Sequence, residues 1–173
     1  MTQQRTKVER IVGVFPTTHG FGYAIFEGPL RLIEWGVKHI PNREQADNLK
    51  KFEALLEWYE PDLVVFENAA GEGSHKSKRI GSLIRAMARR ACKCGVPLTG
   101  YSRARIREAF SQVDAATKHE IAVEIANSFV ELAPLVPNKR KAWTTEEARM
   151  GIFDAASLVL THFHFEHRSG EAA

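Results

Sequence analysis

Residues 10–27, RIVGVFPTTHGFGYAIFE, constrain the fold most, because they contain two apolar runs joined by a short turn. The turn carries two glycines, whose backbones adopt conformations that other residues avoid. This pattern is typical of a hairpin with strands over residues 10–15 and 21–27. Residues 30–40 form a third, partly alternating segment. Strands this close in sequence pair antiparallel, so the sequence predicts a three-stranded antiparallel meander.

The rest of the chain alternates between helix and strand patterns. The continuous apolar run LVVFE at 63–67 is typical of a buried parallel strand, and VPLTGY at 96–101 predicts another short strand. Apolar spacing and capping residues predict helices over 43–59, 80–94, 103–110, 118–132 and 145–165. This order predicts an α/β fold: a mixed five-stranded sheet, made of the meander plus two parallel strands, with helices on both faces.

The chain length of 173 residues suits one domain with its own core. We expect that domain to span 10–165, with flexible ends at 1–9 and 166–173. No apolar run is long enough to cross a bilayer, and the polar start does not resemble a signal peptide. Cys92 and Cys94 are expected to stay reduced. These features favour a cytoplasmic protein without a membrane partner.

The basic residues are distributed unevenly along the chain. Between His75 and Arg107 there are ten Lys or Arg and no Asp or Glu, which leaves 14 basic and 21 acidic residues elsewhere. Such a stretch attracts a polyanion to one part of the molecule. The alternative is a solvated basic surface without a partner.

The ends of strands in an α/β sheet often gather functional side chains at one edge. By this rule Phe15 at the end of the first strand, Glu67 at the end of the fourth and Asp154 on the last helix should converge. Phe15 is unexpected, because the first strand of many such hairpins ends in an aspartate that holds a metal or a phosphate.

Five segments in consistent order resemble the RuvC-type Holliday-junction resolvases of the ribonuclease H-like superfamily. VGVFPTTHGFGYAIFE stands where that family has a strand, Asp-Pro-Gly and a second strand carrying Gly-Tyr. PDLVVFENA resembles its second acidic strand, and GVPLTGYSRARIREAF its strand and the Tyr-led helix after it. ATKHEIAV resembles its Asp-Lys-x-x-Val helix start, and DAASLVLTHFH resembles its C-terminal helix, which ends in a similar His-x-His. The resemblance covers most of 10–165 and implies the same fold.

The resemblance implies hydrolysis of a DNA phosphodiester by two Mg²⁺ or Mn²⁺ ions, held by four carboxylates. Glu67 and Asp154 match two of these and are the candidate metal ligands and catalytic residues. The acid of the first strand has become Phe15, and the other acid of the last helix falls on Gly151. Lys118 matches a lysine that touches the scissile phosphate, so it is also a candidate catalytic residue.

Other side chains do not restore the metal site convincingly. Glu147 precedes Asp154 by seven residues, which corresponds to about 10 Å along a helix. His19 in the turn is a softer ligand that suits Zn²⁺ better than Mg²⁺. The family also places an aromatic wedge three residues beyond the strand acid, where this chain has Ala70. These departures count against junction-specific cleavage.

The residues of the expected site also have structural interpretations. Glu67 would accept hydrogen bonds at a strand end, and Asp154 would pair with Arg149 or Arg107. Phe15 would fill the core rather than stack on a base.

The basic stretch is the feature most typical of nucleic-acid binding, because Lys and Arg on helix ridges contact phosphates without reading sequence. In the resolvases the equivalent helix also pairs across a dimer axis, so Ile80, Leu83 and Met87 are either contacts of a homodimer or core residues. The candidate nucleic-acid-binding residues are Lys76, Lys78, Arg79, Arg85, Arg89, Arg103, Arg105, Arg107 and Lys118.

Three functions follow from these patterns. The leading hypothesis is a RuvC-like protein that binds branched or duplex DNA, with Mg- or Mn-dependent cleavage lost or weakened and with no required cofactor in the extreme case. The second is an active structure-selective endonuclease with a metal site rebuilt around Glu67 and Asp154. The third is an actin-like domain that uses the turn TTHGFG to bind a nucleotide phosphate.

Overall fold

The protein is described by a computed structural model that covers residues 8–68, 70 and 76–171. Within these ranges no helix combines the length and the apolar character needed to cross a lipid bilayer. The strands form one sheet with the order β3-β2-β1-β4-β5. The five strands are β1 (Arg10–Thr17), β2 (Gly20–Glu27), β3 (Leu32–His39), β4 (Leu63–Glu67) and β5 (Leu98–Tyr101).

The pairing of the strands confirms the predicted mixed sheet. β1 pairs antiparallel with β2, and β2 pairs antiparallel with β3, which makes the meander. β4 runs parallel to β1, and β5 runs parallel to β4. The two parallel strands therefore end at the same edge of the sheet as β1, as a βα topology requires.

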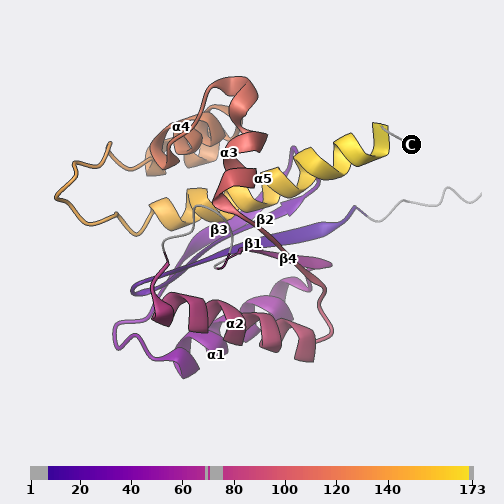
Figure 1. Cartoon of the computed structure of the whole chain (residues 1–173). Coiled ribbons are helices and arrows are strands. Elements are labelled where there is room, and N and C mark those ends of the chain that lie inside the picture. The colour runs from indigo at the N-terminus through magenta and orange to yellow at the C-terminus, as the bar shows by residue number, and fades with distance from the viewer. Residues whose placement is uncertain (1–7, 69, 71–75, 172–173) are drawn as a thin grey trace, which may run out of the picture.

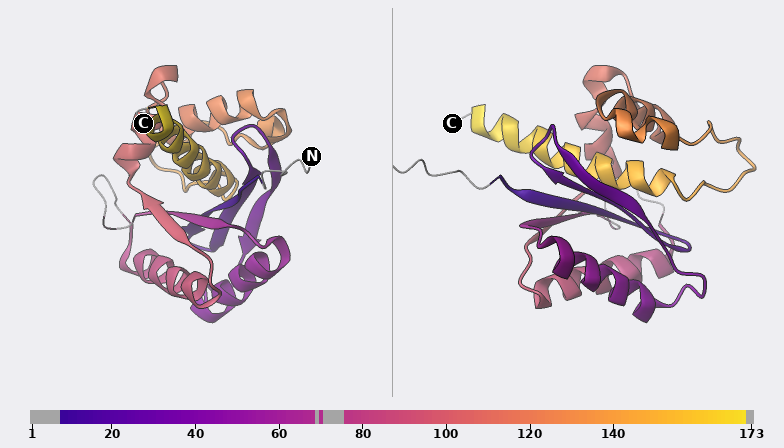
Figure 2. Two further views of the ribbon diagram at one scale, coloured as in Figure 1. Left: turned by 90° about the vertical axis from the view of Figure 1, so that its right-hand side faces the viewer. Right: turned by 180° about the vertical axis from the view of Figure 1, so that it is seen from behind.

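Helices cover both faces of the sheet (Figure 1). Both views in Figure 2 show the sheet between two helical layers, with α1 and α2 on one face and α5, α3 and α4 on the other. The helices are α1 (Gln45–Tyr59), α2 (Lys78–Lys93), α3 (Arg103–Ala109), α4 (Lys118–Ser128) and α5 (Met150–Glu171), with short 3₁₀ turns η1 (Ser111–Val113) and η2 (Val130–Leu135).

The alternation of side chains along β1 separates two cores. Ile11 and Phe15 belong to the core under α5, whereas Val12 and Val14 belong to the core under α1 and α2. β4 follows the same period of two, with Val65 facing α5. The register then places Glu67, two residues further on, on the same face as Phe15.

Small residues let α5 lie close against the sheet. A Cβ atom added to Gly13 would be 2.1 Å from the carbonyl oxygen of Ala155, and one added to Gly22 would be 2.2 Å from the backbone of Gly151. Only glycine allows such an approach between a strand and a helix. This contact brings Asp154, on α5, over the face that carries Phe15.

The last two predicted helices have other boundaries in the structure. The helix predicted for 118–132 ends at Ser128 and continues as the 3₁₀ turn η2, which contains Pro134. The helix predicted for 145–165 begins only at Met150, because Glu146 turns to Lys118 instead of starting a helix. It then runs to Glu171, so residues 166–171 extend this helix past its predicted end.

Candidate functional site

Phe15, Glu67 and Asp154 converge, as their positions in the sequence predicted. All three side chains are almost fully buried, with 4–6% of their surface exposed. Val14 of β1 pairs in parallel register with Phe66 of β4, so Phe15 and Glu67 follow side by side at the ends of their strands. We call these three residues, together with Lys76, Lys118 and Arg103, the central cluster.

Two ammonium groups lie over the phenyl ring of Phe15. Lys76 Nζ is 3.9 Å from the ring centroid, and Lys118 Nζ is 4.7 Å from it. A cation within about 6 Å of a ring centroid is attracted by the negative face of the aromatic ring. Phe15 is therefore both a core residue and a platform for two lysines, whereas the sequence suggested core filling or base stacking.

Both surviving carboxylates are neutralised by cations of the chain itself. Glu67 Oε2 lies 3.2 Å from Lys76 Nζ. Asp154 accepts hydrogen bonds from Arg103 at 3.1 Å and from Lys118 at 2.9 Å.

The suggested partners of Asp154 were therefore wrong. Arg149 pairs with Glu147, and Arg107 is exposed. Arg103 takes that place because it opens α3, which packs against α5.

Local helix starts hold the two lysines in place. Lys118 is the first residue of α4, where Thr117 and Glu120 form a capping box: each side chain accepts a hydrogen bond from the backbone N–H of the other. Lys76 precedes α2, whose N-cap Ser77 accepts a hydrogen bond from the N–H of Ile80 at 3.3 Å. Caps of this kind fix the direction in which the chain enters a helix.

Lys76 is a buried lysine, with 11% of its side chain exposed. Burial lowers the pKa of its ammonium below the ordinary value, and the neighbouring Glu67 carboxylate offsets part of this shift. The sequence placed Lys76 among the surface cations that bind phosphates. In the structure its side chain is instead mostly buried and paired with Glu67.

The side chains of the central cluster do not fit a pair of divalent cations. Mg²⁺ requires several hard oxygen ligands in octahedral array, and Phe15 offers none. At the position of the other family acid, a Cβ atom on Gly151 would already lie 3.3 Å from the Cα of Gly22, so a carboxylate there requires the helix to shift. In the described parts of the chain no group of three or more His, Cys, Asp and Glu could hold a metal ion.

The two substitute ligands considered from the sequence are also engaged elsewhere. Glu147 lies ahead of α5 and pairs with Arg149. His19 accepts a hydrogen bond from Arg43 at 3.2 Å, and partial desolvation followed by the Arg43 charge lowers its pKa below the ordinary value. A lowered pKa keeps the imidazole neutral near pH 7, but its neighbour is a guanidinium and not a metal.

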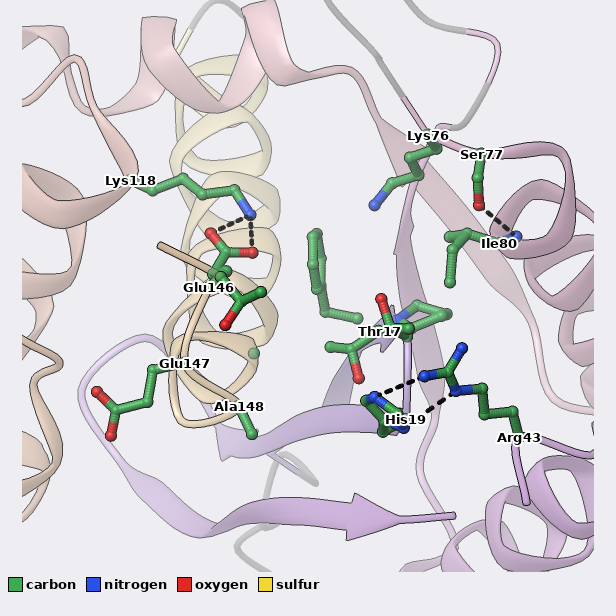
Figure 3. A pocket seen from close by; sticks show the side chains of 15 residues that line it. Thr17, His19, Arg43, Lys76, Ser77, Ile80, Lys118, Glu146, Glu147 and Ala148 are labelled. Atoms are coloured by element: carbon green, nitrogen blue, oxygen red, sulfur yellow. Dashed lines mark hydrogen bonds and ion pairs between the residues drawn. The ribbon is translucent and has the colours of Figure 1, made fainter. Parts of the chain in front are cut away.

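A pocket of about 660 Å³ opens beside Phe15. Figure 3 shows that Lys118 and Glu146 meet on one side of it, and that Arg43, His19 and Thr17 come from another side. Lys118 donates to both carboxylate oxygens of Glu146, at 3.0 and 3.1 Å. Sequence reasoning missed Glu146, because this residue was assigned to the start of a helix. Its contact with Lys118 joins residues 28 positions apart, so no local sequence pattern indicates it.

The predicted nucleic-acid-binding residues divide into three groups. Lys78, Arg85, Arg89 and Arg107 are exposed and make no hydrogen bond or ion pair within the described residues. Lys76, Lys118 and Arg103 belong to the central cluster, and both lysines also line the pocket. Two have other partners: Arg79 donates to the carbonyl oxygens of Thr18 and Arg43, and Arg105 pairs with Glu108 and lies over the ring of Phe165.

The apolar face of α2 belongs to the core. Leu83 and Met87 are buried under the sheet, and Ile80 packs against the same cluster. Of the two interpretations of these residues, the structure therefore supports the core.

A basic loop next to the pocket went unrecognised as a binding candidate. Lys139, Arg140, Lys141 and Trp143 line a second pocket of about 630 Å³, which shares Lys118 and Glu146 with the first. Trp143 is 81% exposed, and Lys141 Nζ lies 5.7 Å from its ring centroid. The run NKRK followed by a tryptophan was the available signal, since basic residues interleaved with aromatic ones are typical of nucleic-acid surfaces.

Comparison with known proteins shows which solved structures share this fold. No protein-family model and no curated protein sequence matches the chain. Among solved structures, RuvC of Thermus thermophilus is 19% identical with a TM-score of 0.65, and the alignment covers 92% of this chain and 96% of that chain.

Two further structures agree with this result. T. thermophilus RuvC in complex with Holliday junction substrate is 17% identical, with a TM-score of 0.63 and the same coverage. The yeast mitochondrial Holliday junction resolvase is 14% identical, with a TM-score of 0.59, over 93% of this chain and 82% of that chain. The chain therefore has the ribonuclease H-like fold of the RuvC-type Holliday junction resolvases.

Proposed function

We propose that this protein binds branched or duplex DNA through its backbone phosphates and does not cleave it by metal-dependent hydrolysis. The observation that carries the proposal is the central cluster, in which lysine and arginine side chains neutralise Glu67 and Asp154. The fold is that of a junction nuclease, but the positions that would hold metal ions carry ammonium groups and a phenyl ring.

The lack of cleavage follows from the chemistry of the residues present. In two-metal hydrolysis one ion activates the attacking water and the other stabilises the leaving oxygen. Here Phe15 supplies no ligand, and each of the two carboxylates would have to give up a cation that already contacts it at 2.9–3.2 Å. An ammonium group carries a single charge and, unlike a divalent metal ion, does not convert a bound water into a hydroxide nucleophile.

DNA binding is supported by the cations that are not engaged elsewhere. Arg85 and Arg89 lie one turn apart on the exposed side of α2, and Lys78 is exposed at the start of that helix. Such side chains release counterions when they contact phosphates, which drives binding without sequence readout. One similar structure is described as RuvC with a Holliday junction substrate, which makes a four-way junction the first ligand to test.

The proposal includes a homodimer. A four-way junction has two-fold symmetry, so a dimer with a two-fold axis would present its basic surface twice to equivalent arms. The proposal assigns no residues to the dimer contact, because Leu83 and Met87, the candidates on α2, lie inside the monomer.

The test compares binding and cleavage of a labelled four-way junction and a duplex of the same sequence. We expect both to bind, with an affinity that falls steeply as salt rises, and no cleavage with Mg²⁺ or Mn²⁺. ATP and the two metal ions should leave the melting temperature unchanged. Turnover comparable to that of T. thermophilus RuvC, abolished by Glu67→Gln or Asp154→Asn, would instead establish the active nuclease; absence of any DNA binding would refute the proposal as a whole.

A further inference from the structure

Lys118 differs from the other cations of the central cluster in what it faces. Its ammonium touches the buried Asp154, the ring of Phe15 and, on the pocket side, Glu146. Its side chain is 31% exposed, against 11% for Lys76 and 12% for Arg103. Lys118 is therefore the most exposed cation of the central cluster, and its ammonium group contacts both a buried carboxylate and the pocket.

Glu146 accepts hydrogen bonds from the Lys118 ammonium group on the side that faces the pocket. The carboxylate lies within 3.1 Å of Lys118 Nζ through both oxygens. Its side chain is 36% exposed, and among the described residues it makes no other hydrogen bond or ion pair. It belongs to the non-helical segment between η2 and α5, and it lines both pockets. A phosphodiester of a nucleic acid also presents two negatively charged oxygens, which the ammonium group of a lysine binds in place of a carboxylate.

The resemblance to the RuvC-type resolvases already implies that Lys118 contacts a backbone phosphate. We propose that Glu146 masks Lys118 in the DNA-free protein, and that a backbone phosphate displaces this carboxylate when DNA enters the pocket beside Phe15. The inference rests on the proposed DNA binding and adds to it an autoinhibitory contact. Arg43 and the hydroxyl of Thr17 line the same pocket and supply a second cation and a donor for the phosphate oxygens.

The exchange requires that Glu146 leave easily while Asp154 stays. An ion pair exposed to water is weak, and the Glu146–Lys118 pair is about one third exposed on both sides. Asp154 is 4% exposed and keeps Arg103 as a second partner, so the buried pair does not open when Glu146 moves. Lys118 thus holds one fixed and one exchangeable anion.

The chain offers a matched control in the adjacent residue. Glu147 carries the same charge in the same segment, but its carboxylate pairs with Arg149 and points away from Lys118 (Figure 3). Glu146→Gln and Glu147→Gln therefore change the net charge equally, and only the first frees Lys118. General electrostatic attraction predicts equal effects for the two variants.

Fluorescence anisotropy with a labelled four-way junction measures the difference. We expect Glu146→Gln to tighten binding about two- to fivefold relative to the unchanged protein, the range expected for loss of one exposed competing ion pair. Glu147 lines the same pocket, but Glu147→Gln should change affinity by less than about 1.5-fold, because Arg149 already neutralises its carboxylate and the change frees no lysine. Equal effects of the two variants would overturn the inference while leaving the proposed DNA binding intact.

A double-mutant cycle identifies Lys118 as the group that Glu146 covers. In a Lys118→Gln background, Glu146→Gln should behave like Glu147→Gln, since no ammonium remains to be freed. If Glu146→Gln still tightens binding there, Glu146 does not act by masking Lys118 and the inference fails. Failure of the unchanged protein to bind any DNA would refute the proposed function itself and with it this inference.

Discussion

The central cluster and the exposed side of α2 draw their cations from nearly the same part of the chain and use them differently. In the cluster, Lys76 and Arg103 are about nine-tenths buried, and each contacts a buried carboxylate. On α2, Arg85 and Arg89 are exposed and have no partner in the described residues. Lys76 and Arg103 are therefore engaged within the protein, whereas Arg85 and Arg89 are free to contact an external polyanion.

The difference shows that a count of basic residues does not measure a binding surface. What matters is the free energy of bringing a phosphate to each cation: a buried, paired lysine must first leave its carboxylate uncompensated in a medium of low polarity. An exposed arginine only exchanges water and counterions for the phosphate. Three experiments test whether the two regions are as distinct as their contacts indicate.

The largest expected effect is on stability, from Lys76→Met. The change leaves Glu67 buried without its cation, which should lower the free energy of unfolding by about 3–5 kcal/mol, measured by guanidinium denaturation. Lys78→Met, two residues away and exposed, should stay within about 0.5 kcal/mol of the unchanged protein. Adding Glu67→Gln to Lys76→Met should recover part of the loss; a Lys76→Met protein as stable as Lys78→Met would place Lys76 with the surface cations.

A smaller effect, on affinity alone, is expected from Arg85→Ala combined with Arg89→Ala. Loss of two phosphate contacts should weaken junction binding roughly ten- to a hundredfold at 0.1 M salt and reduce the salt slope by about two, with stability unchanged. Arg90→Ala on the same helix is the control, because Arg90 pairs with Glu53. An equal loss of affinity with Arg90→Ala would mean that pairing does not separate binding from structural cations.

The smallest effect concerns the pH dependence of stability. Burial holds the pKa of Lys76 below its ordinary 10.5, so between the two pKa values the unfolded chain binds more protons than the folded one. The contribution of Lys76 to the free energy of unfolding must then rise with pH across that window. Denaturation at pH 8 and pH 10 should show a growing difference between the unchanged protein and Lys76→Met; a constant difference would contradict the depressed pKa.

The sheet and its order were predictable because they rest on local patterns. The apolar runs of β1, β2 and β4 and the short connections between the first strands leave few ways to pair them. The convergence of Phe15, Glu67 and Asp154 followed from that topology. The start of α5 was not predictable in the same way, because Glu146 takes part in a contact with Lys118, 28 residues earlier in the chain.

The sequence by itself determined the fold, the loss of the acid at Phe15 and the excess of basic residues between 75 and 107. Only the tertiary structure decided which of those basic residues are buried against Glu67 and Asp154 and which remain free. The physical reason is that helices and strands follow from the spacing of apolar residues that are near neighbours in the chain. The pairing of charges instead depends on distances and burial between segments that meet only after folding.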